Sequence, residues 1–462
     1  MEVVLASRVE VRGVNPGDPA HAAAIDRLRE RFDRENPVYW DARRFRRPCR
    51  HIVRRIELID GPDAGGVVRG PRGAWKEVVG CLGDLVDAPV REATAFPEAL
   101  HLALTGELRD YQAAAVEAAV REAGGVIQAP TGSGKTVVAM GLVARLRTPA
   151  LIVVHTSVLL EQTAARVRQF LGVEPALVGG GHDSPGQADC LSGGPGGDVT
   201  IAMVQTLMRR DLAPWRDRFG LVVLDEAHHC PAETFKSVVQ AFAARYRVGL
   251  TATPNRKDRL HPVLYDVVGP LVHVVAPKTL VATGSIARVE VIHVETEFRG
   301  AFRNNYGRLI NRVAADPGRN ALLVEKIRQL HAGRSLVLSE RVDHCRMLAD
   351  RLAEAGVKAV AMTGETPREA REDLLRRFAS GDVEALVSTT ALVGEGFDLP
   401  AIDTVFLTIP NGNVAKTTQA LGRALRPHEG KAAGRIVDFV DSRVSLLRNQ
   451  FNRRLRVYQR FR

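Results

Sequence analysis

The sequence predicts an α/β protein in which two parallel-sheet units in tandem follow a small N-terminal α+β domain. From Glu107 onward, short apolar segments alternate with amphipathic helical segments. Short buried strands separated by helices are typical of parallel sheets with crossover connections. Examples before about residue 275 are "GGVIQAPTGSGKTVVAMGLVARL" (124–146) and "ALIVVHTSVLLEQTAARVRQFL" (150–171), and examples after it are "SLVLSERVDHCRMLADRLAEAG" (335–356) and "TVFLTIP" (404–410).

The chain of 462 residues is long enough for roughly three domains of about 150 residues each. We expect an N-terminal accessory domain over residues 1–106, a first α/β lobe over 107–275 and a second over 276–462. The last 20 residues, "RVSLLRNQFNRRLRVYQRFR", carry seven arginines at spacings that predict a basic C-terminal helix.

The N-terminal domain contains an arginine cluster, "DARRFRRPCRHIVRR" (41–55), in which seven arginines surround Trp40 and Phe45. The alternating apolar positions of "HIVRRIELID" (51–60) predict a strand. The cluster has two interpretations. It is either a face that binds phosphates or a solvated face balanced by nearby acids. The candidate balancing acids are Glu57, Asp60 and Asp63.

The composition favours a polyanionic partner and a reduced compartment. The net charge is +11 and the isoelectric point about 9.8, although arginine richness can also reflect genomic base composition. Five cysteines without a C-x-x-C pair argue against a disulfide framework or a zinc ribbon, and the neighbours His228, His229 and Cys230 are a poor metal cluster. No signal peptide and no run of 18 apolar residues is present, so we expect a cytoplasmic protein without a membrane partner.

The segment "APTGSGKT" (129–136) predicts a phosphate-binding loop, because an apolar strand precedes it and a helix follows it. Its glycines let backbone N–H groups surround a phosphate at the positive end of the helix. Lys135 would reach the β- and γ-phosphates, and Thr136 would hold Mg²⁺. Ala129 stands where the strict pattern has glycine. The residues expected to hold the nucleotide are Pro130, Thr131, Gly132, Ser133, Gly134, Lys135 and Thr136.

The segment "VVLDEAHH" (222–229) supplies two carboxylates at the end of a second apolar strand. In parallel sheets, ligands bind at the carboxyl ends of the strands. Asp225 would therefore hold Mg²⁺ through water, and Glu226 would polarise the attacking water as a general base. His228 is either a satisfied surface histidine or a link from the nucleotide site to the neighbouring unit.

Upstream, "LRDYQ" (108–112) offers groups for the nucleotide base. The Gln112 amide can pair with the N6/N7 edge of adenine, and Arg109 can stack or pair nearby. The alternative is an ordinary helix start with Asp110 near the cap.

Together these segments resemble the superfamily 2 helicases and translocases, with "DEAH" as the second acidic motif. The resemblance covers about residues 107–445 and implies two RecA-like lobes that bind Mg-ATP and a nucleic-acid strand. The further segments that carry it, in order, are "VHTSVLLEQT" (154–163), "TIAMVQTLM" (200–208), "LTATP" (250–254), "TGETP" (363–367), "STTALVGEGFDLP" (388–400) and "QALGRALRP" (419–427).

The resemblance also implies roles for residues of the second lobe. Gly396 and Asp398 match its nucleotide contacts, and Arg423 and Arg426 match the arginines that reach the γ-phosphate when the lobes close. Planar cations delivered there stabilise the charge that spreads over the phosphoryl oxygens in the transition state.

Finer features favour DNA as the substrate. "TATPNRKDRL" (251–260) resembles the arginine–acid–acid element of the xeroderma pigmentosum B group of DNA repair helicases, with Lys257 in place of one acid. "LVLSERVDHC" (336–345), "GEGFDLP" (394–400) and the arginine-rich tail resemble phage and bacterial helicases related to restriction-enzyme motor subunits. The DEAD-box RNA helicases would have aspartate at position 228.

We therefore expect an ATP-dependent DNA helicase or translocase. An RNA helicase of the same fold, and a nucleotide-gated motor subunit of a repair or defence complex that does not unwind by itself, are the alternatives. A protein partner could bind through residues 1–106, and the oligomeric state stays open.

Overall fold

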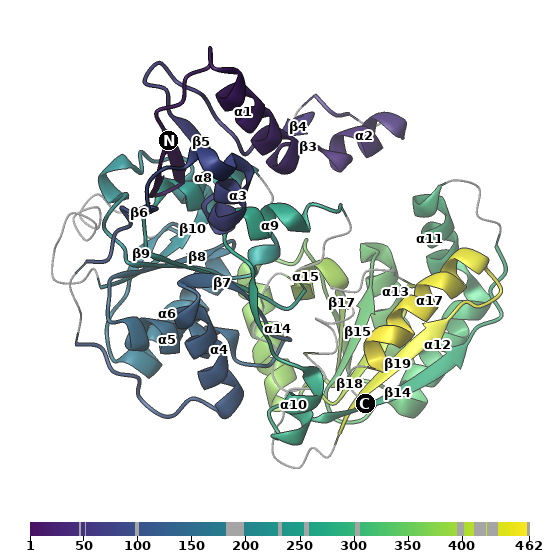
Figure 1. Ribbon diagram of the computed structural model, residues 1–462. Coiled ribbons are helices and arrows are strands. Elements are labelled where there is room, and N and C mark those ends of the chain that lie inside the picture. Colours follow the sequence, from purple (N-terminus) through teal and green to yellow (C-terminus); the bar gives the residue numbers. More distant parts are fainter. Residues whose placement is uncertain are drawn as a thin grey trace. The chain divides into compact units, whose positions relative to one another are not determined.

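The computed structural model describes residues 1–45, 48–50, 52–97, 101–181, 198–229, 233–253, 258–300, 305–394, 402–410, 422 and 433–459. The chain forms two compact units (Figure 1). The first unit comprises Met1–Ala129 and Gly134–Val275, and the second comprises Pro130–Ser133 and Ala276–Arg462. The domain boundaries expected from the sequence stay predictions.

The N-terminal part of the first unit is a small α+β structure. Its strands pair in the order β5-β2-β1-β6, and the two-residue strands β3 and β4 form a separate ribbon. The strand expected within 51–60 is thus shortened to Arg55–Ile56, which pairs with Arg34–Glu35. The elements are β1 (Glu2–Leu5), β2 (Val9–Arg12), α1 (Pro19–Phe32), β3 (Arg34–Glu35), α2 (Pro37–Arg44), β4 (Arg55–Ile56), β5 (Val68–Gly70), α3 (Trp75–Leu82) and β6 (Arg91–Glu92).

Helix α1 illustrates how the local sequence determines where a helix begins and which of its residues are buried. Asp18 caps its start by accepting a hydrogen bond from the backbone N–H of Ala20, and a proline occupies the first turn. Four apolar residues recur at helical spacing and are buried. They are Ala24, Ile25, Leu28 and Phe32.

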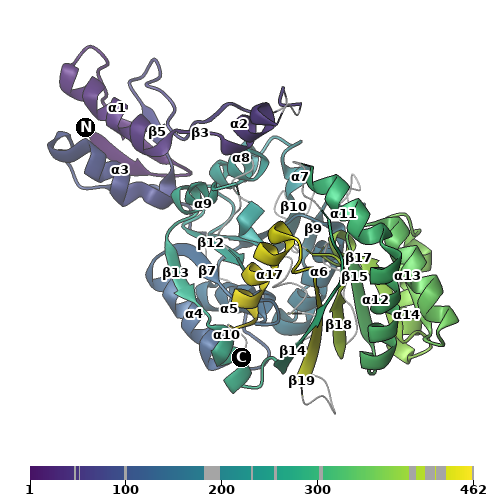
Figure 2. The same ribbon diagram turned by 90° about the vertical axis from the view of Figure 1, so that its right-hand side faces the viewer.

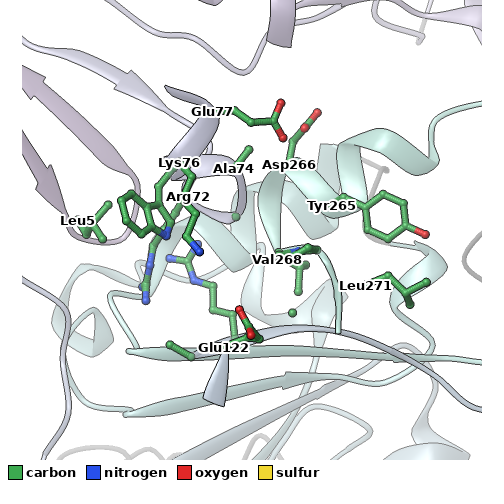
Figure 3. A pocket seen from close by; sticks show the side chains of 18 of the residues that line it. Leu5, Arg72, Ala74, Lys76, Glu77, Glu122, Tyr265, Asp266, Val268 and Leu271 are labelled. Carbon is green, nitrogen blue, oxygen red and sulfur yellow. The ribbon is translucent and has the colours of Figure 1, made fainter. Parts of the chain in front are cut away.

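Polar contacts between residues far apart in the sequence attach the N-terminal part to the rest of the first unit. The Arg34 guanidinium lies 2.5 Å from a carboxylate oxygen of Asp266, which is 3% exposed. The Arg72 guanidinium donates to the backbone carbonyls of Ala244 and Arg245, at 2.6 Å each. Figure 3 shows Arg72 and Asp266 at the wall of a cavity of about 900 Å³ along this boundary. Because acids and bases both line that cavity, it indicates no particular ligand.

Gly73 brings the two parts into direct backbone contact. A Cβ atom added there would lie 2.5 Å from the Gly269 nitrogen and 2.6 Å from the Tyr265 carbonyl oxygen. Backbone atoms at these distances cannot yield without moving one part away from the other.

We expect Gly73→Ala to lower the free energy of unfolding by about 1–3 kcal/mol, the usual cost of overpacking. Denaturant unfolding of the full chain measures this. Gly80→Ala is the matched control, because Gly80 lies within α3 and a Cβ there meets nothing within 4 Å. Equal stability of the two variants would mean that the contact at Gly73 is not tight.

The remainder of the first unit is a parallel α/β lobe. The structure describes a seven-stranded sheet in the order β13-β7-β12-β11-β8-β10-β9, with parallel neighbours throughout. Strands β8 and β11 are buried along their whole length, as their unbroken apolar sequences predict. The elements are α4 (Asp110–Arg121), β7 (Gly124–Gln128), α5 (Lys135–Leu146), β8 (Ala150–Val154), α6 (Ser157–Leu171), β9 (Ala176–Val178), β10 (Val199–Met203), α7 (Val204–Leu207), β11 (Leu221–Leu224), α8 (Glu233–Ala241), β12 (Tyr246–Thr251), α9 (His261–Val267) and β13 (Leu271–Val274).

The second unit holds another parallel sheet, in the order β14-β19-β18-β15-β17-β16. Two parallel-sheet lobes are thus present, and the predicted fold class is confirmed. The elements are α10 (Pro277–Ala282), β14 (Arg288–Glu295), α11 (Tyr306–Ala315), α12 (Pro317–Leu330), β15 (Ser335–Ser339), α13 (Val342–Glu354), β16 (Ala359–Met362), α14 (Arg368–Ser380), β17 (Ala385–Thr389), α15 (Thr390–Gly394), β18 (Thr404–Leu407), β19 (Ala433–Val440) and α17 (Ser445–Tyr458).

Helix α17 contains four of the C-terminal arginines, and these do not all lie on a solvated face. Arg454 is 2% exposed and donates to both carboxylate oxygens of Asp438, at 2.7 and 2.9 Å. The Tyr458 hydroxyl also donates to Asp438, at 2.6 Å. Arg454 therefore anchors the helix to β19. Figure 2 shows α17 beside the sheet of the second unit.

Among the helices that the structure describes, none combines the length and the apolar character that crossing a membrane requires.

Candidate active site

The phosphate loop connects strand β7 to helix α5, in the context that its sequence predicts. Gly132 and Gly134 have φ angles of +88° and +77°, in the left-handed region that favours glycine. Gly134 precedes α5 directly, so the loop ends at the positive end of the helix dipole. Lys135 and Thr136 are the first two residues of that helix, and both are half-buried.

The two predicted carboxylates follow β11 at the carboxyl edge of the same sheet. The Lys135 ammonium lies 3.7 Å from the nearer Glu226 carboxylate oxygen, and both side chains are largely buried. The Asp225 backbone N–H donates to the Val153 carbonyl, and the Asp225 carboxylate accepts from the Glu226 backbone N–H at 2.9 Å. Lys135 and Glu226, which are 91 positions apart in the sequence, therefore meet at one point of the fold.

Glu226 adopts an uncommon backbone conformation, with a φ angle of +48°. A non-glycine residue in the left-handed region is strained by about 1–3 kcal/mol and persists only where its surroundings hold it. Here the contacts from Lys135 and His228 hold the side chain. Such strain is frequent at functional sites.

The electrostatics of the two carboxylates differ. Burial raises the pKa of Asp225 to about 6, and the neighbouring charge of Glu226 adds to the rise. Burial also acts to raise the pKa of Glu226, but Lys135 and His228 outweigh it and lower that pKa to about 2. Two adjacent carboxylates beside one lysine leave excess negative charge, which is the environment that a divalent cation neutralises.

His228 links the acidic pair to strand β12, which lies between β7 and β11 in the sheet. Its Nδ1 lies 3.3 Å from a Glu226 carboxylate oxygen and 3.1 Å from the Thr251 hydroxyl oxygen. Thr251 ends β12 within "LTATP", and its hydroxyl accepts from the Thr253 backbone N–H at 3.2 Å. His228 therefore connects the acidic pair to "LTATP" (250–254), one of the segments that carry the resemblance.

The structure places Gln112 against the phosphate loop. A Cβ atom on Gly134 would lie 2.6 Å from the Gln112 amide nitrogen, and Gln112 is 4% exposed. Its amide oxygen accepts from the Arg109 backbone N–H at 3.1 Å, while the Arg109 guanidinium donates to the Tyr111 hydroxyl at 3.3 Å. Gln112 thus helps to form the start of α4 as well as the edge of the loop. Its reading of adenine, with Arg109 nearby, stays a prediction.

A contact that the sequence did not indicate joins two of the segments that carry the resemblance, "VHTSVLLEQT" (154–163) and "TIAMVQTLM" (200–208). The Gln205 amide donates to the His155 carbonyl at 2.9 Å, so the ends of β8 and β10 are connected. Burial lowers the pKa of His155, with smaller effects from Glu226 and His228. The parallel pairing of β8 and β10 could have predicted this neighbourhood, but not the hydrogen bond.

In the second unit, Thr390 of "STTALVGEGFDLP" donates from its hydroxyl to the Ser339 carbonyl at 3.0 Å, which ties the start of that segment to the end of β15. Thr363 of "TGETP" is buried, and its hydroxyl accepts from the Glu365 backbone N–H at 3.3 Å. The two segments thus lie at the carboxyl ends of β17 and β16, which are neighbouring strands of one sheet. The predicted residues Gly396, Asp398, Arg423 and Arg426 lie outside the residues that the structure describes, as do Arg256 and Lys257.

Across the described part of the chain, no three His, Cys, Asp or Glu side chains gather into a metal-binding cluster. A magnesium site built from Asp225 and the Thr136 hydroxyl is smaller than such a cluster, and it stays a prediction. Mg²⁺ itself typically takes one or two carboxylates from the protein and completes its shell with water and phosphate.

Two family models match the chain. That of the type III restriction enzyme res subunit covers residues 105–256, and that of the helicase conserved C-terminal domain covers residues 318–428. Each match overlaps one of the two lobes expected over residues 107–275 and 276–462, and the first match begins two residues before its lobe.

Individual proteins are similar over both lobes. The DNA 3'-5' translocase XPB2 of Sulfurisphaera tokodaii is 30% identical over 368 residues, which cover 71% of this chain and 80% of that protein. The DNA 3'-5' helicase XPB of Kineococcus radiotolerans is 28% identical over 393 residues, covering 82% of this chain and 68% of that protein. The crystal structure of the Pyrococcus furiosus Hef helicase domain matches with a TM-score of 0.53 and 16% identity, covering 75% of this chain and 98% of that one, which shows a common fold.

Proposed function

We propose, from the premise that this chain belongs to the superfamily 2 helicases related to xeroderma pigmentosum B, that its site couples ATP hydrolysis to movement along DNA or to its unwinding. The observation that carries the proposal is the meeting of Lys135 and Glu226, beside Asp225, at the carboxyl edge of the first lobe's sheet. A phosphate loop beside two carboxylates is the arrangement that phosphoryl transfer to water needs.

In this mechanism the first lobe binds and orients the nucleotide. The backbone N–H groups of the phosphate loop and the Lys135 ammonium hold the β- and γ-phosphates. Glu226 orients the attacking water and accepts its proton, and His228 fixes the position of the Glu226 carboxylate. Arg423 and Arg426 are proposed to stabilise the charge that develops on the γ-phosphate.

The residues present fit Mg²⁺. Burial and the Glu226 charge both disfavour the charged form of the Asp225 carboxylate, and a bound cation would stabilise that form. Asp225, through water, and the Thr136 hydroxyl would hold the ion. When bound, Mg²⁺ neutralises phosphate charge and polarises the phosphoryl oxygens.

The names of the relatives support a finer proposal on direction. A 3′-to-5′ movement is stated for both the Sulfurisphaera and the Kineococcus proteins. We therefore expect 3′-to-5′ translocation on DNA by this chain. A protein partner at residues 1–106 stays a prediction that no described contact tests.

Strand displacement tests this proposal. The chain, with ATP and Mg²⁺, is added to partial duplexes that carry a single-stranded tail on either the 3′ or the 5′ side. Release of the short strand from the 3′-tailed substrate alone is the expected result. Stimulated ATP hydrolysis without displacement on either substrate would favour the alternative of a motor subunit that needs a partner.

Lys135→Ala should abolish turnover, because the lysine is the cation placed to hold the β- and γ-phosphates. Steady-state ATP hydrolysis with saturating single-stranded DNA measures the effect. Lys278→Ala is a matched control, since Lys278 lies in the short helix α10 of the second unit, outside the predicted nucleotide site. Normal turnover by Lys135→Ala would refute the assignment of the phosphate loop.

A further inference from the structure

An unusual share of the exposed apolar surface lies in one short segment of the N-terminal part. Among the described residues, four of the nine large hydrophobic side chains that remain exposed fall between residues 38 and 53. They are Val38, Trp40, Phe45 and Val53, exposed by 37%, 37%, 59% and 48%. Isolated exposed apolar residues need no explanation, but a local group of them marks an interaction site.

Arginines accompany these apolar groups. The Arg54 and Arg43 guanidinium carbons lie 5.2 and 5.9 Å from the centre of the Trp40 ring, and that of Arg44 lies 5.8 Å from the Phe45 ring. These distances place the cations within the range of cation–π attraction. We call Val38, Trp40, Arg43, Arg44, Phe45, Val53 and Arg54 the Trp40 surface.

The fold builds this surface from two separate segments. Strands β3 and β4 pair, and the Asn36 backbone N–H donates to the Arg54 carbonyl at 2.9 Å. The Asn36 side chain caps α2 by accepting from Val38, and donates to the Val53 carbonyl at 2.9 Å. Arg54 is thereby held beside Trp40, 14 residues earlier in the chain. Figure 1 shows α2 beside strands β3 and β4, and Figure 2 shows α2 beside β3.

The charge of the surface is positive. Its exposed arginines Arg43, Arg44 and Arg54, with the exposed arginines Arg50 and Arg55 nearby in the sequence, outnumber the exposed acids Glu35 and Asp41. Glu35 accepts a hydrogen bond from the Trp40 indole N–H at 2.5 Å, so this carboxylate orients the ring. Aromatic rings that lie between guanidinium groups match a ligand that is a polyanion and carries flat apolar rings.

We propose that the Trp40 surface binds single-stranded nucleic acid, with bases stacked on Trp40 and its flanking guanidiniums and with phosphates held by the arginines. The inference rests on the proposed function, since it adds a second contact for the same strand. Aromatic and arginine planes stack unpaired bases, whereas bases inside a duplex are not accessible to them.

Fluorescence anisotropy of a labelled 30-nucleotide DNA strand, without ATP, tests the proposal on the full chain. An abasic strand of equal length and charge is the second probe. Trp40→Ala should weaken binding of the normal strand about tenfold, the effect of losing one stacked base, and leave the abasic strand unaffected. Trp40→Phe should keep most of the affinity, because it retains an aromatic ring.

The arginines have a separate signature. Arg43→Gln with Arg54→Gln should reduce the slope of log affinity against log salt by about 1.4, the value for two phosphate contacts on a single strand. Phe96→Ala is the matched control, because Phe96 is also exposed (44%) and also carries a guanidinium over its ring, from Arg245 at 5.8 Å. It should change neither affinity nor slope.

Equal affinity of the original chain and Trp40→Ala for the normal strand would overturn the inference, and so would an equal loss for the normal and abasic strands. Thermal unfolding of each variant checks that the fold is intact. If no polymer stimulates ATP hydrolysis by the original chain, the proposed function fails. If DNA stimulates it but every Trp40-surface variant binds normally, only this inference fails.

Discussion

Glu226→Gln should lower the turnover number for ATP hydrolysis by about 10²–10⁴-fold, the usual contribution of a general base, while ATP still binds. The amide keeps the shape of the carboxylate but cannot accept the proton of the attacking water. The loss of charge also removes the attraction to the Lys135 ammonium, 3.7 Å away in the structure. That lysine then remains available to the phosphates, so affinity should not fall.

Single-turnover hydrolysis and titration with a fluorescent ATP analogue separate the two effects. Glu117→Gln is the matched control, because Glu117 is an exposed acid on α4 that pairs with Arg145 at 2.8 Å. It should leave both quantities unchanged. An unaltered turnover number in Glu226→Gln would exclude Glu226 as the base.

Arg319→Ala should lower the free energy of unfolding of the second unit by about 3–5 kcal/mol, because it leaves a buried carboxylate without its cation. Arg319 and Asp441 form an ion pair at 2.8 Å in which both side chains are fully buried. Arg319 also donates to the Thr408 carbonyl at 2.6 Å, and the Thr296 hydroxyl donates to Asp441. The network joins β14, α12 and the ends of β18 and β19.

Denaturant unfolding followed by circular dichroism measures this loss. Arg168→Ala provides the control, since Arg168 forms a two-point pair with Glu174 on the exposed surface of α6. Exposed pairs contribute about 0–1 kcal/mol, so that variant should be almost as stable as the original chain. Similar losses for the two variants would contradict the view that burial makes the Arg319 pair critical.

The sequence predicts the parallel sheets well because their strands are buried on both faces. "LIVV" and "LVVL" cannot alternate polar and apolar residues when both sides contact helices. The phosphate loop and the acidic pair are predicted for a related reason, since their residues are local and their chemistry requires the end of a strand.

Long-range contacts could not be predicted in this way. The Arg34–Asp266 pair spans 232 residues and the Arg319–Asp441 pair spans 122, and neither leaves a periodic signal in the sequence. The C-terminal arginines show the same limit, because their spacing predicts α17 but not the burial of Arg454 against Asp438. Pairing partners depend on topology, which local patterns do not determine.

The central claim is that this site hydrolyses ATP in response to DNA. The most direct test is the steady-state rate of ATP hydrolysis alone and with single-stranded DNA, duplex DNA, forked DNA or RNA, each at two salt concentrations. The account predicts stimulation by at least one form of DNA, stronger at low salt because the strand is held through its phosphates. A rate that is unchanged by every form of DNA, or that rises with RNA alone, would contradict the account.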